Sequence, residues 1–336
     1  MVARKIRSSI PPKKTSIIRP RKLQPGDTIS IVAPASPPLT PEVFDIAREK
    51  LESAGFKVQI STLAKKRLGF LAGSDSDRLK DFNRALSNPK VRALLCVRGG
   101  HGCLRLVDSI DLGAFRRDPK LIIGLSDVTT LHCLFNSQLN ASTLHGPVAQ
   151  GLTQPDCPPF TWHSFIQSIS AEREPPVSIC EGYADYDKTV YSLKRGVATG
   201  RLVGGNLTIL TSLLGTKLFP ALDGKILFLE DIGEMPFRID RCLTRLVQSG
   251  VLNKVAGFAL GLFKDCEYRP FKEGDLVEYK QTLRDVFKDR LSPLGKPIVV
   301  GLPFGHTPHN ASIPTLALAT LDGNKRDLIL EESPFS

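Results

Sequence analysis

Short apolar runs alternate with amphipathic segments through the first half of the chain. A compact apolar run closed by Gly or Pro is typical of a buried strand, whereas apolar side chains spaced three and four residues apart are typical of a helix. The expected strands are 28–33, 57–61, 91–97 and 121–123, and the expected helices are 41–54 and 77–86. This alternation predicts an α/β domain over residues 23–168, with a parallel sheet and helices on both faces.

The pattern changes in the second half. Residues 151–192 are rich in proline and follow neither period, so we expect a linker with little structure of its own at 169–192. Beyond it, short apolar runs punctuated by glycine predict a smaller β-rich domain over residues 193–336. The expected strands there are 196–203, 225–229, 255–261 and 297–300, and the expected helices are 206–214, 238–250 and 274–290.

The composition is that of a soluble globular protein, with 41% hydrophobic and 24% charged residues. A length of 336 residues fits two domains of ordinary size. No run approaches the roughly 18 consecutive apolar residues of a membrane helix, and no apolar segment follows the first basic residues as in a secretory signal. We therefore expect neither a membrane span nor secretion.

The formal net charge of +11 is concentrated at the start of the chain. Residues 1–22 hold eight Lys or Arg and no acid, which leaves a net charge of about +3 for the rest. Because the body is nearly balanced, we do not expect a nucleic-acid partner. We interpret residues 1–22 as a flexible solvated tail; attachment to an anionic lipid or polymer, and a transit peptide, are the alternatives.

The seven cysteines indicate a reducing compartment rather than a disulfide framework. No pair has Cys-x-x-Cys spacing and most lie in apolar segments, so we expect buried free thiols and a cytoplasmic protein. No His, Cys and Asp cluster has the spacing of a metal site, and we expect no catalytic metal. Gly99-Gly-His-Gly102 lacks the third glycine of a dinucleotide loop, so we expect no nucleotide cofactor either.

Ser126 is the strongest candidate for a catalytic nucleophile. It follows an apolar strand that ends at Gly124, at a strand-to-helix turn that holds a hydroxyl clear of the sheet. The full Gly-x-Ser-x-Gly pattern is absent, because Val128 stands at its last position. The competing interpretation, equally compatible with the local sequence, is a serine that caps the following helix.

A nucleophilic serine needs a base and an orienting carboxylate, and both candidates lie in the second half of the chain. Glu230 ends an apolar run, although Asp231 and Glu234 lie close by and a solvated strand end is the simpler local interpretation. His306 lies in a loop rich in Gly and Pro, with His309 as a rival. Glycines that follow a strand, as at Gly99-Gly100, also allow backbone N–H groups to face an oxyanion.

In order and spacing, these motifs make the chain resemble the LD-carboxypeptidase family of serine peptidases. The resemblance is collinear over about residues 23–330. It is carried by Arg98-Gly-Gly100, Ile123-Gly-Leu-Ser-Asp127, His145-Gly-Pro147, Gly204-Gly-Asn-Leu207, Leu229-Glu-Asp231 and Gly301-Leu-Pro-Phe-Gly-His306. The family includes muramoyltetrapeptide carboxypeptidases and the microcin C self-immunity peptidases.

The resemblance implies a Rossmann-like N-terminal domain, a smaller β-barrel-like C-terminal domain and a homodimer. It implies Ser126 as nucleophile, His306 as general base and Glu230 as the carboxylate that orients it, with the amides of Gly100 and Asp127 as oxyanion hole. We expect Arg98 to hold the free carboxylate of the substrate, and His101 and His145 to be further substrate contacts.

Three functions follow as hypotheses. The first is an LD-carboxypeptidase that removes the terminal D-alanine from recycled murein tetrapeptides. The second is an amidase that inactivates a peptidyl-nucleotide antibiotic of the microcin C type, which needs an aromatic side chain to stack on the adenine. The third is a binding module in which Ser126 only caps a helix and the basic tail binds the partner.

Overall fold

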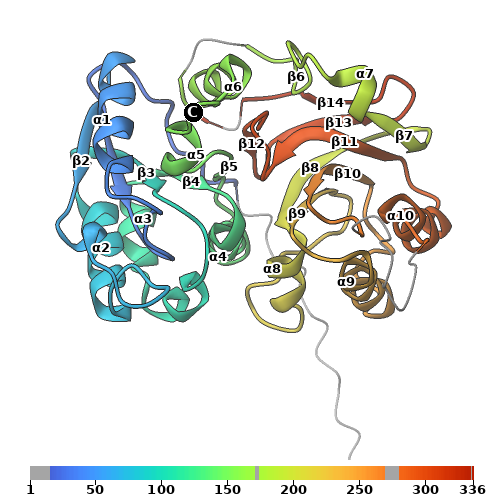
Figure 1. Ribbon diagram of the computed structural model, residues 1–336, viewed down its shortest axis with the longest axis horizontal. Helices are drawn as coiled ribbons and strands as arrows, with labels where there is room; N and C mark the ends of the chain where they lie inside the picture. Colours follow the sequence, from blue (N-terminus) through green and yellow to red (C-terminus); the bar gives the residue numbers. More distant parts are fainter. Residues whose placement is uncertain (1–15, 171–173, 269–279, 334) are drawn as a thin grey trace, which may run out of the picture.

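The computed structural model describes residues 16–170, 174–268, 280–333 and 335–336. The chain forms two α/β domains, each built on its own sheet, which lie side by side (Figure 1). This arrangement confirms the predicted fold class, an α/β protein with a parallel-sheet N-terminal domain and a second domain built on its own sheet.

The first sheet has six strands in the order β12-β5-β4-β3-β1-β2. The five strands from β5 to β2 run parallel, and the edge strand β12 comes from the C-terminal region and pairs antiparallel with β5. The strand bounds are β1 Thr28–Val32, β2 Lys57–Ile60, β3 Val91–Cys96, β4 Leu121–Gly124, β5 Leu144–His145 and β12 Ile313–Pro314. The parallel order 2-1-3-4-5 is that of a doubly wound fold, whose ligand sites lie at the carboxyl ends of the strands where the order reverses.

Helices cover both faces of this sheet, as the sequence predicts. Buried side chains of α2, α3 and α4 pack on one face, and those of α1, α5 and α6 pack on the other. The bounds are α1 Val43–Ser53, α2 Asp75–Ser87, α3 Leu112–Arg117, α4 Thr129–Leu139, α5 Ala149–Leu152 and α6 Pro159–Ile169. Ser74 starts α2 through a capping box with Asp77.

The second sheet has eight strands in the order β6-β14-β13-β8-β9-β10-β11-β7. Its centre, β8-β9-β10-β11, is parallel, and the strands outside it pair antiparallel. The bounds are β6 Val177–Ser178, β7 Tyr191–Lys194, β8 Val197–Asn206, β9 Ile226–Ile232, β10 Gly257–Lys264, β11 Ile298–Gly305, β13 Leu318–Asp322 and β14 Asp327–Leu330. Buried residues of β8 to β14 form one core on its inner side, as in a barrel-like sheet.

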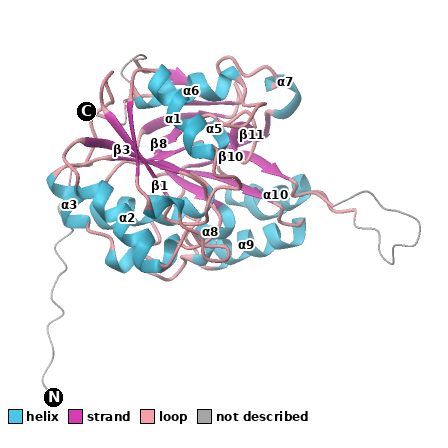
Figure 2. Cartoon of the chain, turned by 60° about the vertical axis from the view of Figure 1, so that its left-hand side comes forward, coloured by secondary structure: helices cyan, strands magenta, loops and turns pink. Residues whose placement is uncertain are grey.

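Three helices cover the outer face of the second sheet. They are α8 Leu207–Ser212, α9 Pro236–Gln248 and α10 Leu283–Leu291, and the short α7 Tyr186–Thr189 precedes β7. Figure 2 shows α8, α9 and α10 on the same side of the strands as α2 and α3, with α1, α5 and α6 on the opposite side. Single 3-10 turns occur at Leu63–Lys65, Cys103–Arg105, Val107–Ser109, Ser126–Val128 and Ser292–Leu294.

One apolar cluster joins the two domains. It runs from α2, α3 and α4 into α8, α9 and α10 without interruption. A continuous close-packed core of this kind fixes the orientation of the two sheets toward each other. Within the described residues, no helix has the length and apolarity needed to cross a membrane.

The structure corrects two expectations about domain organisation. The proposed linker 169–192 has structure of its own, because β6, α7 and the start of β7 lie in it and Ile179, Tyr183 and Val190 are buried in the second core. The expected helix 274–290 begins at Leu283, and residues 274–279 lie outside the described residues.

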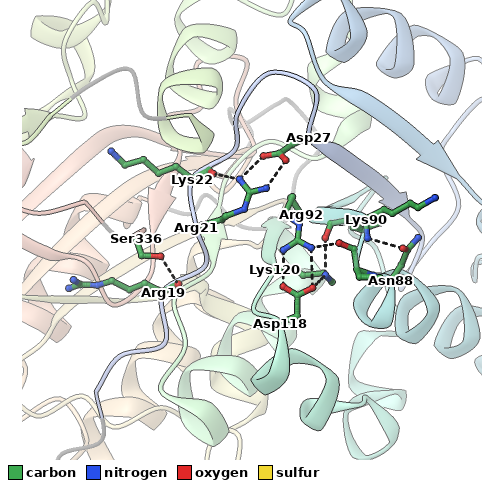
Figure 3. A network of polar contacts seen from close by, with 12 residues as sticks. Arg19, Arg21, Lys22, Asp27, Asn88, Lys90, Arg92, Asp118, Lys120 and Ser336 are labelled. Atoms are coloured by element: carbon green, nitrogen blue, oxygen red, sulfur yellow. Dashed lines mark hydrogen bonds and ion pairs between the residues drawn. The ribbon is translucent and has the colours of Figure 1, made fainter.

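The basic tail is also shorter than predicted. Residues 16–22 pack on the described chain: Ile18 pairs with Ala141, and Arg19 binds Glu332 at 2.7 Å. Arg21 forms a bidentate ion pair with Asp27 (Figure 3). The flexible tail predicted for residues 1–22 is therefore wrong for residues 16–22. Residues 1–15 lie outside the described residues.

A second polar cluster holds the beginning of β4. The buried ammonium group of Lys120 donates to Val91 O at 2.8 Å and to Asp118 at 2.6 Å, and Arg92 binds the same carboxylate (Figure 3). Because each buried charge is paired, this end of β4 is fixed, and β4 leads directly to Ser126.

Candidate active site

The loops after β1, β3 and β4 meet at the carboxyl ends of the first sheet, where a doubly wound fold places its ligand site. There they border a cavity of about 540 Å³. Its walls come from both domains, with Arg98, Gly99, Gly100 and Ser126 from the first and Lys264, Gly305 and His306 from the second. A cavity of this size accommodates a small peptide or a compact ligand.

Ser126 occupies the sharp turn between β4 and α4. Its φ of 67° is unusual for a residue with a side chain, and such strained turns are typical of exposed nucleophiles. Neither the turn Ser126–Val128 nor α4 has a side-chain cap. The hydroxyl is therefore not used as a helix cap, which removes the simpler interpretation of this serine.

Gly99 leaves room for the Ser126 side chain. A Cβ atom at Gly99 would lie 2.5 Å from Ser126 Cβ and 2.9 Å from Ser126 Oγ. Only glycine allows the loop after β3 to approach the serine this closely. The nucleophile candidate and the glycine loop are thus in direct contact.

Glu230 and His306 form a tight pair on the second domain. His306 Nδ1 and Glu230 Oε2 are 2.6 Å apart, and the Glu230 side chain is fully buried. Burial lowers the pKa of His306, but the charge and hydrogen bond of Glu230 raise it more, so the net pKa lies above its usual 6.5. Since Nδ1 is used by the carboxylate, Nε2 is the ring nitrogen left for a substrate-side proton.

The neighbouring carboxylates serve other purposes. Asp231 is buried and accepts hydrogen bonds from Asn206 Nδ2, Thr208 N and Thr208 Oγ1, which fix the start of α8. Glu234 faces Arg238 at 3.4 Å. Glu230 is therefore the carboxylate that contacts the histidine.

The backbone around His306 is shaped for this contact. A Cβ atom at Gly305 would lie 2.9 Å from Glu230 Oε2, so glycine allows the carboxylate to reach the imidazole. Asn310 holds the loop from the other side, accepting from Gly305 N at 3.2 Å and donating its own N–H to Thr161 Oγ1 at 2.8 Å. The histidine loop is thus tied to α6 of the first domain.

Ser126 and His306 line the same cavity, although no direct hydrogen bond joins these two described residues. In unliganded enzymes such bonds are often long and shorten when substrate binds. The arrangement provides a strained serine, an imidazole and a buried carboxylate around one space, which is the set needed for nucleophilic attack on a carbonyl.

The structure places the three predicted substrate contacts in three different environments. Arg98 lines the cavity as expected. His101 is exposed and packs edge-on against Phe70 at 6.0 Å. His145 has no exposed surface and lies against the rings of His132, Phe228 and Phe304, so the expectation that it contacts substrate is wrong for this structure. His145 is buried because it ends β5, which lies between β4 and β12 in the first sheet.

His309, the rival base, contacts aromatic rings, and the histidine that meets Glu230 is His306. The His309 ring lies 5.3 Å from Tyr183 and 6.0 Å from Phe160. The aromatic contact explains its position without a catalytic role.

Sequence reasoning missed several residues at the cavity and behind it. Lys264, Asp156 and Gln150 line the cavity, and Ser36 and Arg78 hold the loops that border it. Ser36 could have been predicted, because it follows the first strand, at the carboxyl end where ligand sites of such sheets form. The others have no local signal. Among the described residues no group of three or more His, Cys, Asp or Glu side chains is arranged to hold a metal.

Comparisons with known proteins identify the family. Residues 29–146 match the model of the LD-carboxypeptidase N-terminal domain, and residues 199–321 match that of the LD-carboxypeptidase C-terminal domain. The chain belongs to the LD-carboxypeptidase family, and it is therefore a peptidase.

Two relatives extend along nearly the whole chain. It is 35% identical to a probable murein peptide carboxypeptidase of Bacillus subtilis (strain 168), over 93% of this chain and 94% of the relative. It is 31% identical to the murein tetrapeptide carboxypeptidase of Pseudomonas aeruginosa, over 90% and 95% respectively.

Solved structures agree in fold. The muramoyltetrapeptide carboxypeptidase of Oxalobacter formigenes matches with a TM-score of 0.77 at 28% identity, over 92% of this chain and 99% of that one. The microcin C7 self-immunity protein MccF matches with a TM-score of 0.83 at 24% identity, over 95% and 100%.

Proposed function

We propose that this chain is a serine LD-carboxypeptidase that removes the terminal D-alanine of murein tetrapeptides during peptidoglycan recycling. The observation that carries the proposal is one cavity lined by the strained Ser126 and by His306, which is paired at 2.6 Å with a buried carboxylate. Two of the relatives are named as a probable murein peptide carboxypeptidase and a murein tetrapeptide carboxypeptidase, which supports the same substrate class.

In the proposed mechanism, Ser126 Oγ attacks the carbonyl carbon of the last peptide bond while His306 Nε2 takes the hydroxyl proton. Glu230 keeps the imidazole in the required tautomer and stabilises the imidazolium that forms. The amides of Gly100 and Asp127 donate to the oxyanion, each donor contributing about 3 kcal/mol to lowering the barrier.

The imidazolium then protonates the departing nitrogen, and the C–N bond breaks to release D-alanine. His306 then deprotonates a water molecule, which attacks the acyl carbon. The ester bond to Ser126 Oγ breaks, the serine takes a proton from the imidazolium, and the shortened peptide leaves with a new carboxyl group.

The charges of the cavity suit a zwitterionic peptide. Arg98 and Lys264 supply positive charge on its two sides, and Asp156 supplies a negative charge. We assign Arg98 to the free carboxylate of the substrate, because a guanidinium binds a carboxylate through two parallel bonds. Asp156 is then available for an ammonium group of the diamino acid.

The second candidate function is an amidase that acts on a peptidyl-nucleotide antibiotic, and the fold shared with MccF favours it. That substrate needs an aromatic platform. The described residues that line the cavity include no Phe, Tyr or Trp, and Trp162 instead packs against Phe165 under the ammonium of Lys50. Muropeptide hydrolysis is therefore the better supported of the two.

The test is incubation with tri-, tetra- and pentapeptide muropeptides, with release of alanine followed by mass. We expect alanine from the tetrapeptide alone, and none from a Ser126→Ala variant. Equal hydrolysis by parent and variant would refute Ser126 as the nucleophile, and no hydrolysis by the parent would favour the binding-module hypothesis. Hydrolysis of an aminoacyl sulfamoyl adenosine, with the tetrapeptide untouched, would establish the antibiotic amidase instead.

The cytoplasmic location and the homodimer belong to the same proposal. The seven cysteines are free, as a reducing compartment would keep them. Analytical ultracentrifugation of the full chain measures the mass in solution, for which we expect twice the 36.8 kDa of one chain.

A further inference from the structure

The side chain of Asp127 points away from the cavity and into the loop that follows β3. Its Oδ2 accepts a hydrogen bond from Cys103 N at 2.8 Å, and only 5% of the residue is exposed. Burial raises the pKa of this carboxyl, although the bonds from Cys103 oppose the shift. A buried carboxyl directly after the nucleophile, bonded to another loop, needs a structural explanation.

The loop that accepts this contact carries Gly99 and Gly100, and two further residues hold it. Ser36 N donates to Gly99 O at 3.1 Å, and His101 N donates to Ser36 Oγ at 3.2 Å. From the opposite side the buried guanidinium of Arg78 donates to Gly102 O at 2.9 Å and also to Pro34 O.

Between these anchors the N–H of Gly100 has no hydrogen-bond partner among the described residues. The N–H of Asp127 lies in the first turn of a 3-10 helix, where no partner exists inside the helix. The two amides that suit an oxyanion hole are thus on separate loops, and their spacing depends on what connects those loops.

We infer that the Asp127 carboxylate is a positioning residue that fixes the Gly99–Cys103 loop to the nucleophile turn and so sets the spacing of the two oxyanion donors. Asp127 supplies one donor through its own backbone. Through its side chain it anchors the loop that carries the other, three residues from Gly100. The inference rests on the proposed function, since it concerns the same site.

The physical consequence is specific to the transition state. Oxyanion donors act only when charge develops on the carbonyl oxygen, so a loosened loop lowers kcat and leaves ground-state binding nearly unchanged. Loss of one such donor costs about 100-fold to 1,000-fold in kcat. A variant that keeps an acceptor for Cys103 N should keep the loop in place.

The experiment compares Asp127→Ala, Asp127→Asn and a control, Asp322→Ala, at a temperature at which circular dichroism shows all of them folded. Asp322 is a good match because it is also nearly buried and accepts backbone N–H bonds from Asn324 and Lys325, in a turn of the second domain. Two rates are measured: alanine release from the tetrapeptide, and labelling of Ser126 by a fluorophosphonate, which also places charge on an oxyanion.

We expect D127A to lose about 100-fold in kcat and in labelling rate with KM changed less than about threefold. D127N should stay within about tenfold of the parent, and D322A within about twofold. The inference is overturned if D127A matches the parent, if D127N is as slow as D127A, or if D322A loses activity to the same degree.

The labelling arm separates this inference from the proposed function. A parent that labels but releases no alanine refutes the tetrapeptide substrate, while the order of labelling rates still decides the role of Asp127. A parent that neither labels nor hydrolyses refutes Ser126 as nucleophile, and the inference falls with it.

Discussion

Replacement of Gly99 by alanine tests the contact between the glycine loop and the nucleophile most directly. The added Cβ atom would lie 2.5 Å from Ser126 Cβ and 3.2 Å from Leu125 O. Gly99 does not have a positive φ, so the methyl group introduces no backbone strain of its own. Any effect on catalysis therefore comes from displacement of neighbouring atoms.

The size of the displacement follows from the contact distance. Non-bonded carbon atoms rest at about 3.5 Å or more, so the two atoms must separate by about 1 Å. Ser126 is held in a strained turn between β4 and α4, and it has little room to adjust while keeping its orientation. Misplacement of a reacting group by about 1 Å costs about 100-fold in rate, or about 2.7 kcal/mol of barrier.

The assay is steady-state hydrolysis of the tetrapeptide, together with the rate at which a fluorophosphonate labels Ser126. Gly151→Ala in α5 is the matched control: it adds the same methyl to the wall of the same cavity, but its nearest neighbour is Pro147 Cβ at 3.9 Å. Gly99→Ala should lose about 100-fold in kcat and Gly151→Ala less than about threefold. If Gly99→Ala keeps kcat within threefold of the parent, the close approach of the loop to Ser126 does not control its geometry. An equal loss in both variants would mean that crowding of the cavity, and not displacement of the serine, is responsible.

Further predictions concern the histidines, the orienting carboxylate and the tail. Glu230→Gln keeps the shape of the side chain but removes its charge, so kcat should fall by about 10⁴-fold, and stopped assays on the purified variant measure this. The kcat/KM of the parent should rise with pH as His306 loses its proton, with an apparent pKa above 6.5. In Glu230→Gln this apparent pKa should be lower, and an unchanged value would contradict the pairing of His306 with Glu230. Because the folded state raises the pKa of His306, protonation of this ring stabilises the fold. This contribution is complete below pH 6.5 and is lost as the pH rises through the folded-state pKa of His306. Burial lowers the pKa of His132 to about 4, so the folded state keeps this ring neutral and should lose about 3 kcal/mol of stability as the pH falls from 6.5 to 4. Urea unfolding across that range should show a shallower acid loss for His132→Gln, which retains a donor for Gly124 O but cannot take up a proton. Removal of residues 1–22 should leave kcat unchanged and lower the free energy of unfolding by on the order of 1 kcal/mol, because the Arg19–Glu332 and Arg21–Asp27 pairs are lost; a loss of turnover would assign the tail a part in catalysis.

The local pattern of the sequence was sufficient for the central framework. The four apolar runs of the first domain are β1, β2, β3 and β4, and the glycine-punctuated runs of the second are β8, β9, β10 and β11. Apart from β2 and the first half of β8, these strands are largely buried, so their composition identifies them. The predictions missed the short strands β5, β6, β7 and β12 and the antiparallel pair β13 and β14. Of these, β6 and β7 lie at the two ends of the second sheet, and β6 and the start of β7 fall in the segment expected to be a linker. A short edge strand is defined by its partner and not by its own composition.

The candidate triad, too, was predicted only in part from the sequence. Position in the chain indicated Ser126, Glu230 and His306, because each was expected at the end of an apolar strand; in the structure Ser126 and His306 follow β4 and β11, whereas Glu230 lies within β9. The sequence left Glu230 beside Asp231 and Glu234, and His306 beside His309. Tertiary structure decided between them. Successive residues of a strand point to opposite faces, so only one of two adjacent carboxylates meets a histidine 76 residues away.

Contacts behind the site also depended on the folded chain. Burial of His145 between the sheets and the bond from Cys103 N to Asp127 join segments that no local period relates. Local sequence determined which segments become strands and which residues lie at their ends, because backbone conformation and burial follow short-range pattern. Which of those residues meet was decided only when the two sheets packed against each other, because such contacts depend on the relative position of whole domains.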